Sequence, residues 1–175
     1  MNKKGFTLVE LLGVLVILGI IIGIAVPNII STLDRNKKET FLSNAKMFIA
    51  AARYEITSGN APRPAANEAT IIKMKCVNFD NFEKDPDGDL YDLERSFVVV
   101  SRKATSGNSE LVYHVQLVTS AARNRGIILA EKDVVDGKGV NRDQRLGIVQ
   151  RNVTPLSKSA VLTSLGRIEK SWSCN

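Results

Sequence analysis

The sequence has little of the chemistry that enzymes commonly use. Among its 175 residues, histidine occurs once and cysteine twice. The one histidine, His114, lies between Tyr113 and Val115 without a cysteine or carboxylate cluster nearby, so a structural role is favoured over a metal ligand. With one histidine and no Gly-x-Ser-x-Gly motif, a catalytic triad has little support. These shortages predict that the protein is not an enzyme.

The two cysteines are Cys76 and Cys174. They lie too far apart in sequence to form a zinc knuckle or a Cys-x-x-Cys redox pair. If the domain is exported, an even number of cysteines favours one disulfide. The alternative is two buried free thiols.

The formal net charge is +6, but the basic residues are scattered. The densest patch after the first five residues consists of Arg35, Lys37 and Lys38, and it is diluted by Asp34 and Glu39. Specific nucleic-acid binding would call for a stripe or face of Lys and Arg, which is missing. Nucleic acid is therefore not expected as a partner.

Polar side chains are absent from Leu11 to Val26. The wider stretch from Phe6 to Ile30 is interrupted only by Thr7, Glu10, Pro27 and Asn28. About 20 apolar residues cross a bilayer as a helix, so this stretch is long enough to do so. A secretory signal peptide fits poorly, because its apolar core is shorter and Ala25-Val26-Pro27 is a poor cleavage site. A plain membrane anchor explains the length but not Glu10, although a carboxylate at the helix end can reach the interface.

The residues Lys3-Lys4-Gly5-Phe6-Thr7-Leu8-Val9-Glu10-Leu11-Leu12 resemble the class III signal of type IV pilins and pseudopilins. The resemblance covers about the first 55 residues well, including Pro27, and the rest loosely. It implies that a prepilin peptidase cuts between Gly5 and Phe6, that the new amino group of Phe6 is N-methylated, and that Glu10 serves in assembly.

A physical reason supports that role of Glu10. Cleavage creates an ammonium at Phe6, which is one helical turn from Glu10. The carboxylate can pair with this ammonium in its own chain or with that of a neighbouring subunit. An unpaired desolvated charge is expensive, so such pairing would set the register of the subunits. Gly19 and Gly23 form a Gly-x-x-x-Gly pair, which lets helices approach closely.

Beyond the apolar stretch, the helical period continues. One apolar face recurs at helical spacing and consists of Phe41, Ala45, Phe48, Ile49, Ala52 and Ile56. Gly59, Pro62 and Pro64 predict an end near Ser58. Pro27 removes one backbone hydrogen bond near Gly23, which predicts a kink or local unwinding there.

After Pro64 the pattern changes to strands and turns. The best strands are Ser96–Arg102 and Leu111–Thr119, joined by a hairpin loop at Thr105–Ser109. A third strand is expected at Gly126–Ala130 and a fourth near Gly147–Asn152, whereas Ile71–Phe79 reads as helix or strand. The fold class predicted is α+β, in which one long N-terminal helix packs its amphipathic half on an antiparallel sheet. The pilin fold has this architecture. The expected segments are a cleaved leader at 1–5, a transmembrane and polymerisation helix at 6–30, its amphipathic half at 31–58, and a soluble sheet domain at 59–175.

An acidic stretch in the soluble part suggests a weak calcium candidate. Its carboxylates are Glu83, Asp85, Asp87, Asp89 and Glu94, several of them at EF-hand-like spacing around Gly88. Pro86 stiffens the loop and the flanks do not read as helices, so a solvated turn is the simpler interpretation. Calcium is the one cofactor considered, and none is expected otherwise. Lys84–Tyr91 also resembles the Asp-Pro-x-Gly loop that precedes a strand in many pilins.

The resemblance also implies function. In similar pilins a disulfide often ties the C-terminal region to the domain, which favours a Cys76–Cys174 bond. The chain is expected to be a structural subunit of a type IV pilus that serves adhesion or motility. It would span the cytoplasmic membrane once as a precursor and then join an extracellular filament. The implied partners are other pilin subunits, minor pilins among them, the prepilin peptidase, the pilus assembly platform and the membrane.

Other readings stay open. Within the family, the chain could be a tip-located minor pilin, or a pseudopilin of a type II secretion or competence DNA-uptake system. Outside it, a single-span membrane protein with a ligand-binding domain predicts an uncut N-terminus at Met1. An exported enzyme would need cleavage near Ala25 and a catalytic cluster that the sequence does not offer.

Overall fold

The computed structural model describes residues 7–77, 84–105, 108–120 and 125–174, without the side chains of 104, 105, 108 and 109. The chain divides into two compact units, Met1–Lys37 and Lys38–Asn175. Helix α1 (Leu8–Thr57) contributes residues to both. Its end at Thr57 agrees with the stop predicted near Ser58, and Gly59 follows with a left-handed backbone (φ 82°).

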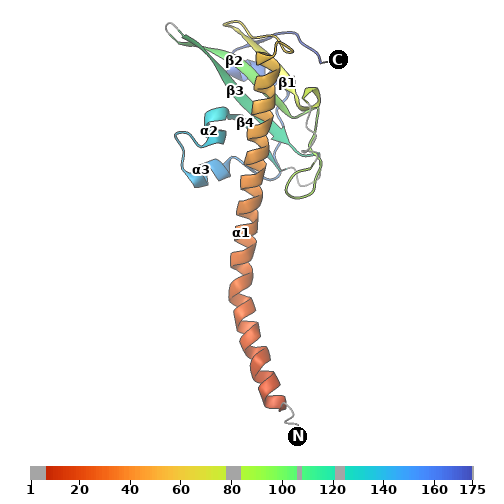
Figure 1. Ribbon diagram of the computed structural model, residues 1–175, viewed down its shortest axis with the longest axis vertical. Helices are drawn as coiled ribbons and strands as arrows, with labels where there is room; N and C mark the ends of the chain where they lie inside the picture. Colours follow the sequence, from red (N-terminus) through yellow and green to blue (C-terminus); the bar gives the residue numbers. More distant parts are fainter. Residues whose placement is uncertain (1–6, 78–83, 106–107, 121–124, 175) are drawn as a thin grey trace. The chain divides into compact units, whose positions relative to one another are not determined.

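The second unit contains a five-stranded sheet. Its strands are β1 (Glu68–Lys73), β2 (Phe97–Thr105), β3 (Asn108–Val118), β4 (Gly126–Glu131) and β5 (Ile168–Glu169), in the order β4-β3-β2-β1-β5 (Figure 1). The first four strands pair antiparallel. Helices α2 (Lys132–Asp136), α3 (Arg142–Gly147) and α4 (Lys158–Leu165) follow the hairpins, and a short 3-10 turn, η1 (Met74–Cys76), continues β1.

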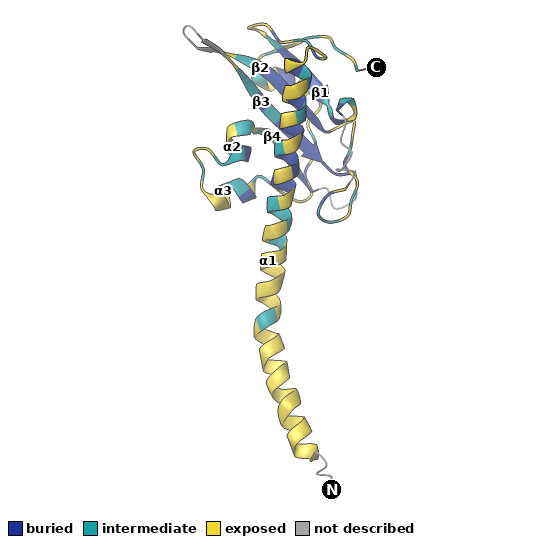
Figure 2. Cartoon of the chain, viewed as in Figure 1, coloured by how far each residue is buried: buried dark blue, intermediate teal, exposed yellow. Residues whose placement is uncertain are grey.

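Apolar side chains cover both faces of this sheet. On one face, Phe41, Phe48 and the other buried residues of α1 pack against alternate residues of β2 and β3, such as Val98 and Val115. On the opposite face, Val161 and Leu162 of α4 pack against Val99 and its neighbours. Figure 2 shows the central strands in the buried colour. The alternation of side chains along each strand therefore supplies two cores.

The predicted fold class is confirmed, and three of the predicted strands correspond to β2, β3 and β4. Two expectations need correction. The sheet is mixed, because the short β5 pairs parallel with β1 through Glu68↔Ile168 and Ala69↔Glu169. The strand expected near Gly147–Asn152 is wrong: this stretch contains the end of α3 and a single bridge between Gln150 and Gly126. The stretch Ile71–Phe79, which was ambiguous, is strand to Lys73 and then η1, and residues 78 and 79 lie outside the described ones.

A tight approach at the start of β4 requires a glycine. A Cβ atom added to Gly126 would lie 2.7 Å from Cγ2 of Val153 and 2.9 Å from Cγ1 of Val118. Real Cβ atoms essentially never come this close to another heavy atom. Gly126 also exchanges two backbone hydrogen bonds with Gln150.

Candidate assembly site

The part of α1 in the first unit exposes nearly every side chain. From Leu8 to Ile30 the apolar side chains are open, with Leu8 83% and Ile24 67% exposed (Figure 2). Among the described residues, α1 is the one helix long and apolar enough to cross a membrane. Exposed apolar surface on this scale marks a site that contacts lipid or other protein chains. Within the described residues, the most apolar window of this helix contains no buried residue.

The start of α1 carries the polar group of this site. The Glu10 carboxylate accepts hydrogen bonds from the backbone N–H of Thr7 at 2.8 Å and from its hydroxyl at 2.9 Å. In return, the N–H of Glu10 donates to the Thr7 hydroxyl at 3.3 Å. This reciprocal pair is a capping box, which satisfies N–H groups that the first helical turn would otherwise leave without partners. Our sequence reasoning assigned Glu10 to assembly and missed Thr7, although the Thr-x-x-Glu spacing was readable.

The capping box fixes where the negative charge lies. Because Glu10 bonds to the N–H of Thr7, its carboxylate is held at the first turn of the helix. The helix dipole also favours negative charge there. Gly5 and Phe6, the expected processing residues, lie outside the described residues. Since Phe6 immediately precedes Thr7 in sequence, a charge created at its amino group would arise close to this carboxylate.

The segment after the apolar stretch stays helical through Pro27. The sequence predicted either a kink or local unwinding of the helix because of Pro27. The structure does not show the unwinding. The Asn28 side-chain amide donates to the carbonyl of Ile24 at 3.1 Å, and the hydroxyls of Ser31 and Thr32 donate to the carbonyl of Asn28. The polar side chains next to Pro27 thus bond to the helix itself, which limits their cost in an apolar environment.

The glycines of the apolar stretch have open surroundings. A Cβ atom added to Gly13, Gly19 or Gly23 would meet no other atom within 4 Å, the helix's own nearby backbone aside. No contact among the described residues therefore requires these glycines. The Gly19–Gly23 pair agrees with close helix packing against another chain, which stays a prediction.

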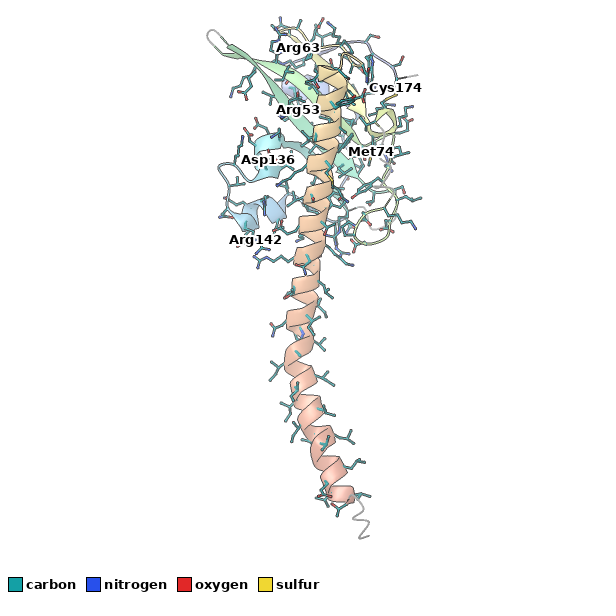
Figure 3. All side chains as sticks on the ribbon, viewed as in Figure 1. Arg53, Arg63, Met74, Asp136, Arg142 and Cys174 are labelled. Carbon is teal, nitrogen blue, oxygen red and sulfur yellow. A yellow bond between two sulfur atoms is a disulfide. The ribbon has the colours of Figure 1, made fainter. Side chains whose placement is uncertain are left out.

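Cys76 and Cys174 are joined by a disulfide, with their Cα atoms 5.4 Å apart. The bond links η1 to the C-terminal tail, where Cys174 is labelled in Figure 3. The indole N–H of Trp172 also anchors the tail, because it donates to the carbonyl of Asn60 at 3.0 Å. The tail is thus fixed at two points of the second unit.

The structure places Asp85, Asp87 and Asp89 in one turn, but it does not arrange the described calcium candidates as a metal site. Asp85 caps its own turn by accepting from the N–H groups of Asp87 and Asp89, and burial raises its pKa. Asp87 forms a buried ion pair with Arg125, whereas Glu94 pairs with Lys73 and Lys75. Glu83 lies outside the described residues. Across the part of the chain that is described, no group of three His, Cys, Asp or Glu residues is suited to hold a metal ion.

The candidate histidine lies within the sheet. His114 is half-buried in β3, opposite Glu131 of β4. Burial lowers its pKa, and the nearby Glu131 charge works in the opposite direction. The position is that of a packed strand residue.

A comparison with protein families identifies the N-terminal segment. The family model of the prokaryotic N-terminal methylation motif matches residues 1–26. These residues carry the class III signal. This match confirms the resemblance to type IV pilins and pseudopilins on which the roles of Gly5, Phe6 and Glu10 rest. The chain matches no curated protein and no solved structure.

The class III signal has general implications for the processing and the location of the chain. It implies cleavage by a prepilin peptidase and assembly with other pilin-type subunits. Together with the apolar helix, it fits a membrane-anchored precursor. The α+β architecture of the described residues is pilin-like, and the family match points to a structural protein of the pilin type.

Proposed function

We propose that this chain is a structural subunit of a type IV pilus. In this proposal it is cut after Gly5, N-methylated at Phe6 and assembled through its N-terminal helix into an extracellular filament for adhesion or motility. One combination supports the proposal: a class III signal precedes an apolar helix whose described side chains are largely exposed. Packing such helices together in a filament core removes that surface from water and from lipid.

The arrangement at Glu10 supports a mechanism of assembly. The capping box holds the carboxylate at the first turn, next to the position where cleavage creates an ammonium. In a filament core, the ammonium of one subunit and the carboxylate of the next would neutralise each other. Subunits docked out of register would leave both charges unpaired in an apolar environment, which is strongly unfavourable.

The first test is the mass and N-terminal sequence of the chain from its native host. We expect the chain to start at Phe6 and to carry one added methyl group. A start at Met1 in a host with an active prepilin peptidase would contradict the proposal and favour a membrane-anchored binding domain.

A pair of variants then separates the two roles of Glu10. Glutamine also serves in a capping box, so Glu10→Gln keeps the helix start and removes the charge. Thr7→Val keeps the charge and removes the hydroxyl of the box. We expect Glu10→Gln to be processed but to leave few filaments on sheared cells, and Thr7→Val to assemble. Equal filament yields from Glu10→Gln and the natural chain would rule out charge pairing as the docking step.

The main alternative is a pseudopilin of a type II secretion or competence system. Processing and methylation would then be the same. Labelling the chain with antibodies on intact cells distinguishes the two, because a pilus subunit lies along long surface fibres. A defect in protein secretion or DNA uptake without such fibres would favour the alternative.

A further inference from the structure

A small pocket lies in the second unit, where the end of β1, the start of α4 and the C-terminal tail meet. Its volume is about 180 Å³. Three lysines and the chain's one tryptophan are among the residues that line it, and the full lining is Ile71, Lys73, Lys75, Cys76, Lys158, Trp172, Ser173 and Cys174. The assembly site uses none of these residues.

The wall formed by the tail is fixed by bonds to two other segments. The disulfide ties Cys174 to Cys76, and the Trp172 indole is held by the Asn60 carbonyl. The Trp172 ring also packs against the core that α1 forms with the sheet. The pocket is therefore a built feature of the fold, since its parts come from distant segments that covalent and hydrogen bonds hold in place.

Two lysines of the pocket already form ion pairs with a carboxylate of the chain itself, that of Glu94. Lys75 donates to Oε1 of Glu94 at 2.6 Å, and Lys73 donates to Oε2 of the same group. The third lysine, Lys158, is the first residue of α4 and pairs with Glu169 at 3.0 Å. The Glu94 side chain is 57% exposed. Exposed ion pairs of this kind contribute little stability, so a carboxylate from outside can compete with Glu94 for the two lysines.

The other side of the pocket is apolar. It is made of buried Ile71, the half-buried Trp172 ring and the disulfide. A simple inorganic anion would leave the apolar side of the pocket exposed to water. A neutral apolar ligand would form no ion pair with the lysines. The matching chemistry is a carboxylate joined to a compact ring with one apolar face, which is the chemistry of a hexuronate sugar. A nucleic acid would favour cations spread along a groove, whereas these lysines converge on one cavity.

We propose that this pocket binds a hexuronate unit of a cell-surface polysaccharide. Lys73 and Lys75 hold the carboxylate, Lys158 adds positive charge, and the Trp172 ring lies against the sugar ring. The inference rests on the proposed function in one respect: a surface filament would present the pocket to such a polysaccharide. Binding itself belongs to the second unit and does not need assembly.

The test uses the full chain in neutral detergent micelles, with the fluorescence of Trp172 as the readout. Because the chain has one tryptophan, this signal reports on the pocket alone. We expect methyl glucuronide to give a saturable change, and methyl glucoside, which lacks the carboxylate, to give none. Raising the salt concentration should weaken binding, because the contact is between charges near the surface.

Three variants sharpen the test. Glu94→Gln removes the internal competitor, so we expect glucuronide to bind about threefold more tightly, the scale of one exposed ion pair. Lys73→Gln combined with Lys75→Gln should weaken binding by about tenfold, because the charge-assisted hydrogen bonds are lost. Lys103→Gln combined with Lys138→Gln changes two lysines outside the pocket and should leave binding as it was. Far-UV circular dichroism checks that each variant folds.

The proposal is overturned if glucuronide gives no saturable signal or if glucoside binds equally well. It is also overturned if acetate alone binds as tightly, which would indicate a general anion site, or if a short DNA strand binds more tightly through the same lysines. A gain of affinity in Glu94→Gln supports it and cannot arise from misfolding. The start of the processed chain is measured separately, so failure here and failure of the pilus proposal give different results.

Discussion

Helix α1 carries two very different surfaces along one continuous element. Before Lys37 its apolar side chains are open, and Leu15 for instance is 58% exposed. After Lys38 the same helical spacing buries one stripe completely, with Phe41 at 0%. The two stretches differ in what covers their apolar side chains. The second stretch meets its own sheet, whereas the first needs lipid or another chain.

This comparison shows how one helix can serve both folding and assembly. A stripe about a third of the helix wide is enough to join α1 to the sheet, and polar residues occupy the remaining faces. The first stretch is apolar all round, which is typical of a helix surrounded on every side by apolar neighbours. Changes in the two stretches should therefore have separable effects, which the following predictions use, from the largest to the smallest.

The disulfide should stabilise the second unit alone. Its cysteines are 98 residues apart, and closing a loop of that size is worth about 4–5 kcal/mol in the chain-entropy model. Replacing both cysteines by serine should lower the free energy of unfolding of the second unit by a comparable amount. The helical signal of the first unit in micelles should not change. Denaturant unfolding with and without a reductant measures this, and equal midpoints would contradict it.

Phe41→Ala should separate the two stretches most directly. The Phe41 ring is fully buried and lies edge-on to the Tyr91 ring, with centroids 5.6 Å apart. Removing a buried phenylalanine costs about 3–5 kcal/mol, and we expect that loss in the second unit. Leu15→Ala is the matched control, because it removes a large apolar side chain from the exposed stretch. Its effect on the unfolding of the second unit should stay within about 0.5 kcal/mol. Similar losses from both variants would show that the two stretches are not independent.

Thr7→Val should loosen only the start of the helix. The substitution keeps the size of the side chain and removes the hydroxyl that bonds to Glu10. Loss of an N-terminal cap costs about 1 kcal/mol of helix stability. Amide hydrogen exchange in micelles should therefore become several-fold faster at residues 8–10 and stay unchanged after residue 38. No change at the first turn would mean that the capping box does not hold in the membrane-like environment.

The smallest effect concerns an ion pair between α1 and α3. Glu39 accepts hydrogen bonds from Arg142 at 2.9 Å and from Arg145 at 3.1 Å (Arg142 is labelled in Figure 3). Burial raises the pKa of Glu39, but the hydrogen bonds and charges of the two arginines outweigh burial, so the pKa is lowered. A lowered pKa gives stability that is present above the ordinary value near 4.5 and is lost as the pH falls below it.

For this partly exposed pair we expect a contribution of about 0.5–1 kcal/mol. Glu39→Gln should therefore destabilise the second unit at pH 7 and have little effect at pH 3. Urea midpoints of the two proteins at both pH values measure the difference. A gap that persists at pH 3 would show that packing, and not charge, is responsible.

Much of the fold was predictable because its signals are local and strong. The long helix follows from an apolar run and then a helical stripe, and its end follows from Gly59 and two prolines. Strands β2 and β3 are rich in Val, and Phe97 and Tyr113 add to their strand propensity. The Thr7–Glu10 capping box is also readable from the sequence, because Thr-x-x-Glu directly precedes an apolar run.

The remaining elements depend on contacts between distant segments. Strand β5 has two residues, and only its pairing with β1 makes it a strand. Residues 147–152 contain Val and Ile and read as a strand, but α3 occupies Gly147, and beyond it Gln150 alone bridges to Gly126. The lysine pocket brings together β1, α4 and the tail, which no local pattern reveals. Its disulfide was expected from the resemblance, but the neighbouring tryptophan was not singled out.

The glycines of the chain will differ in how selection constrains them. At Gly126 any larger residue collides with Val118 and Val153, so every cell that must fold the chain has to retain glycine there. At Gly19 and Gly23 the chain itself offers no obstacle to a side chain. If natural variants nevertheless keep glycine at those two positions, the constraint comes from neighbouring subunits. Sequence variation across strains would thus distinguish positions constrained by folding from positions constrained by contacts with other chains.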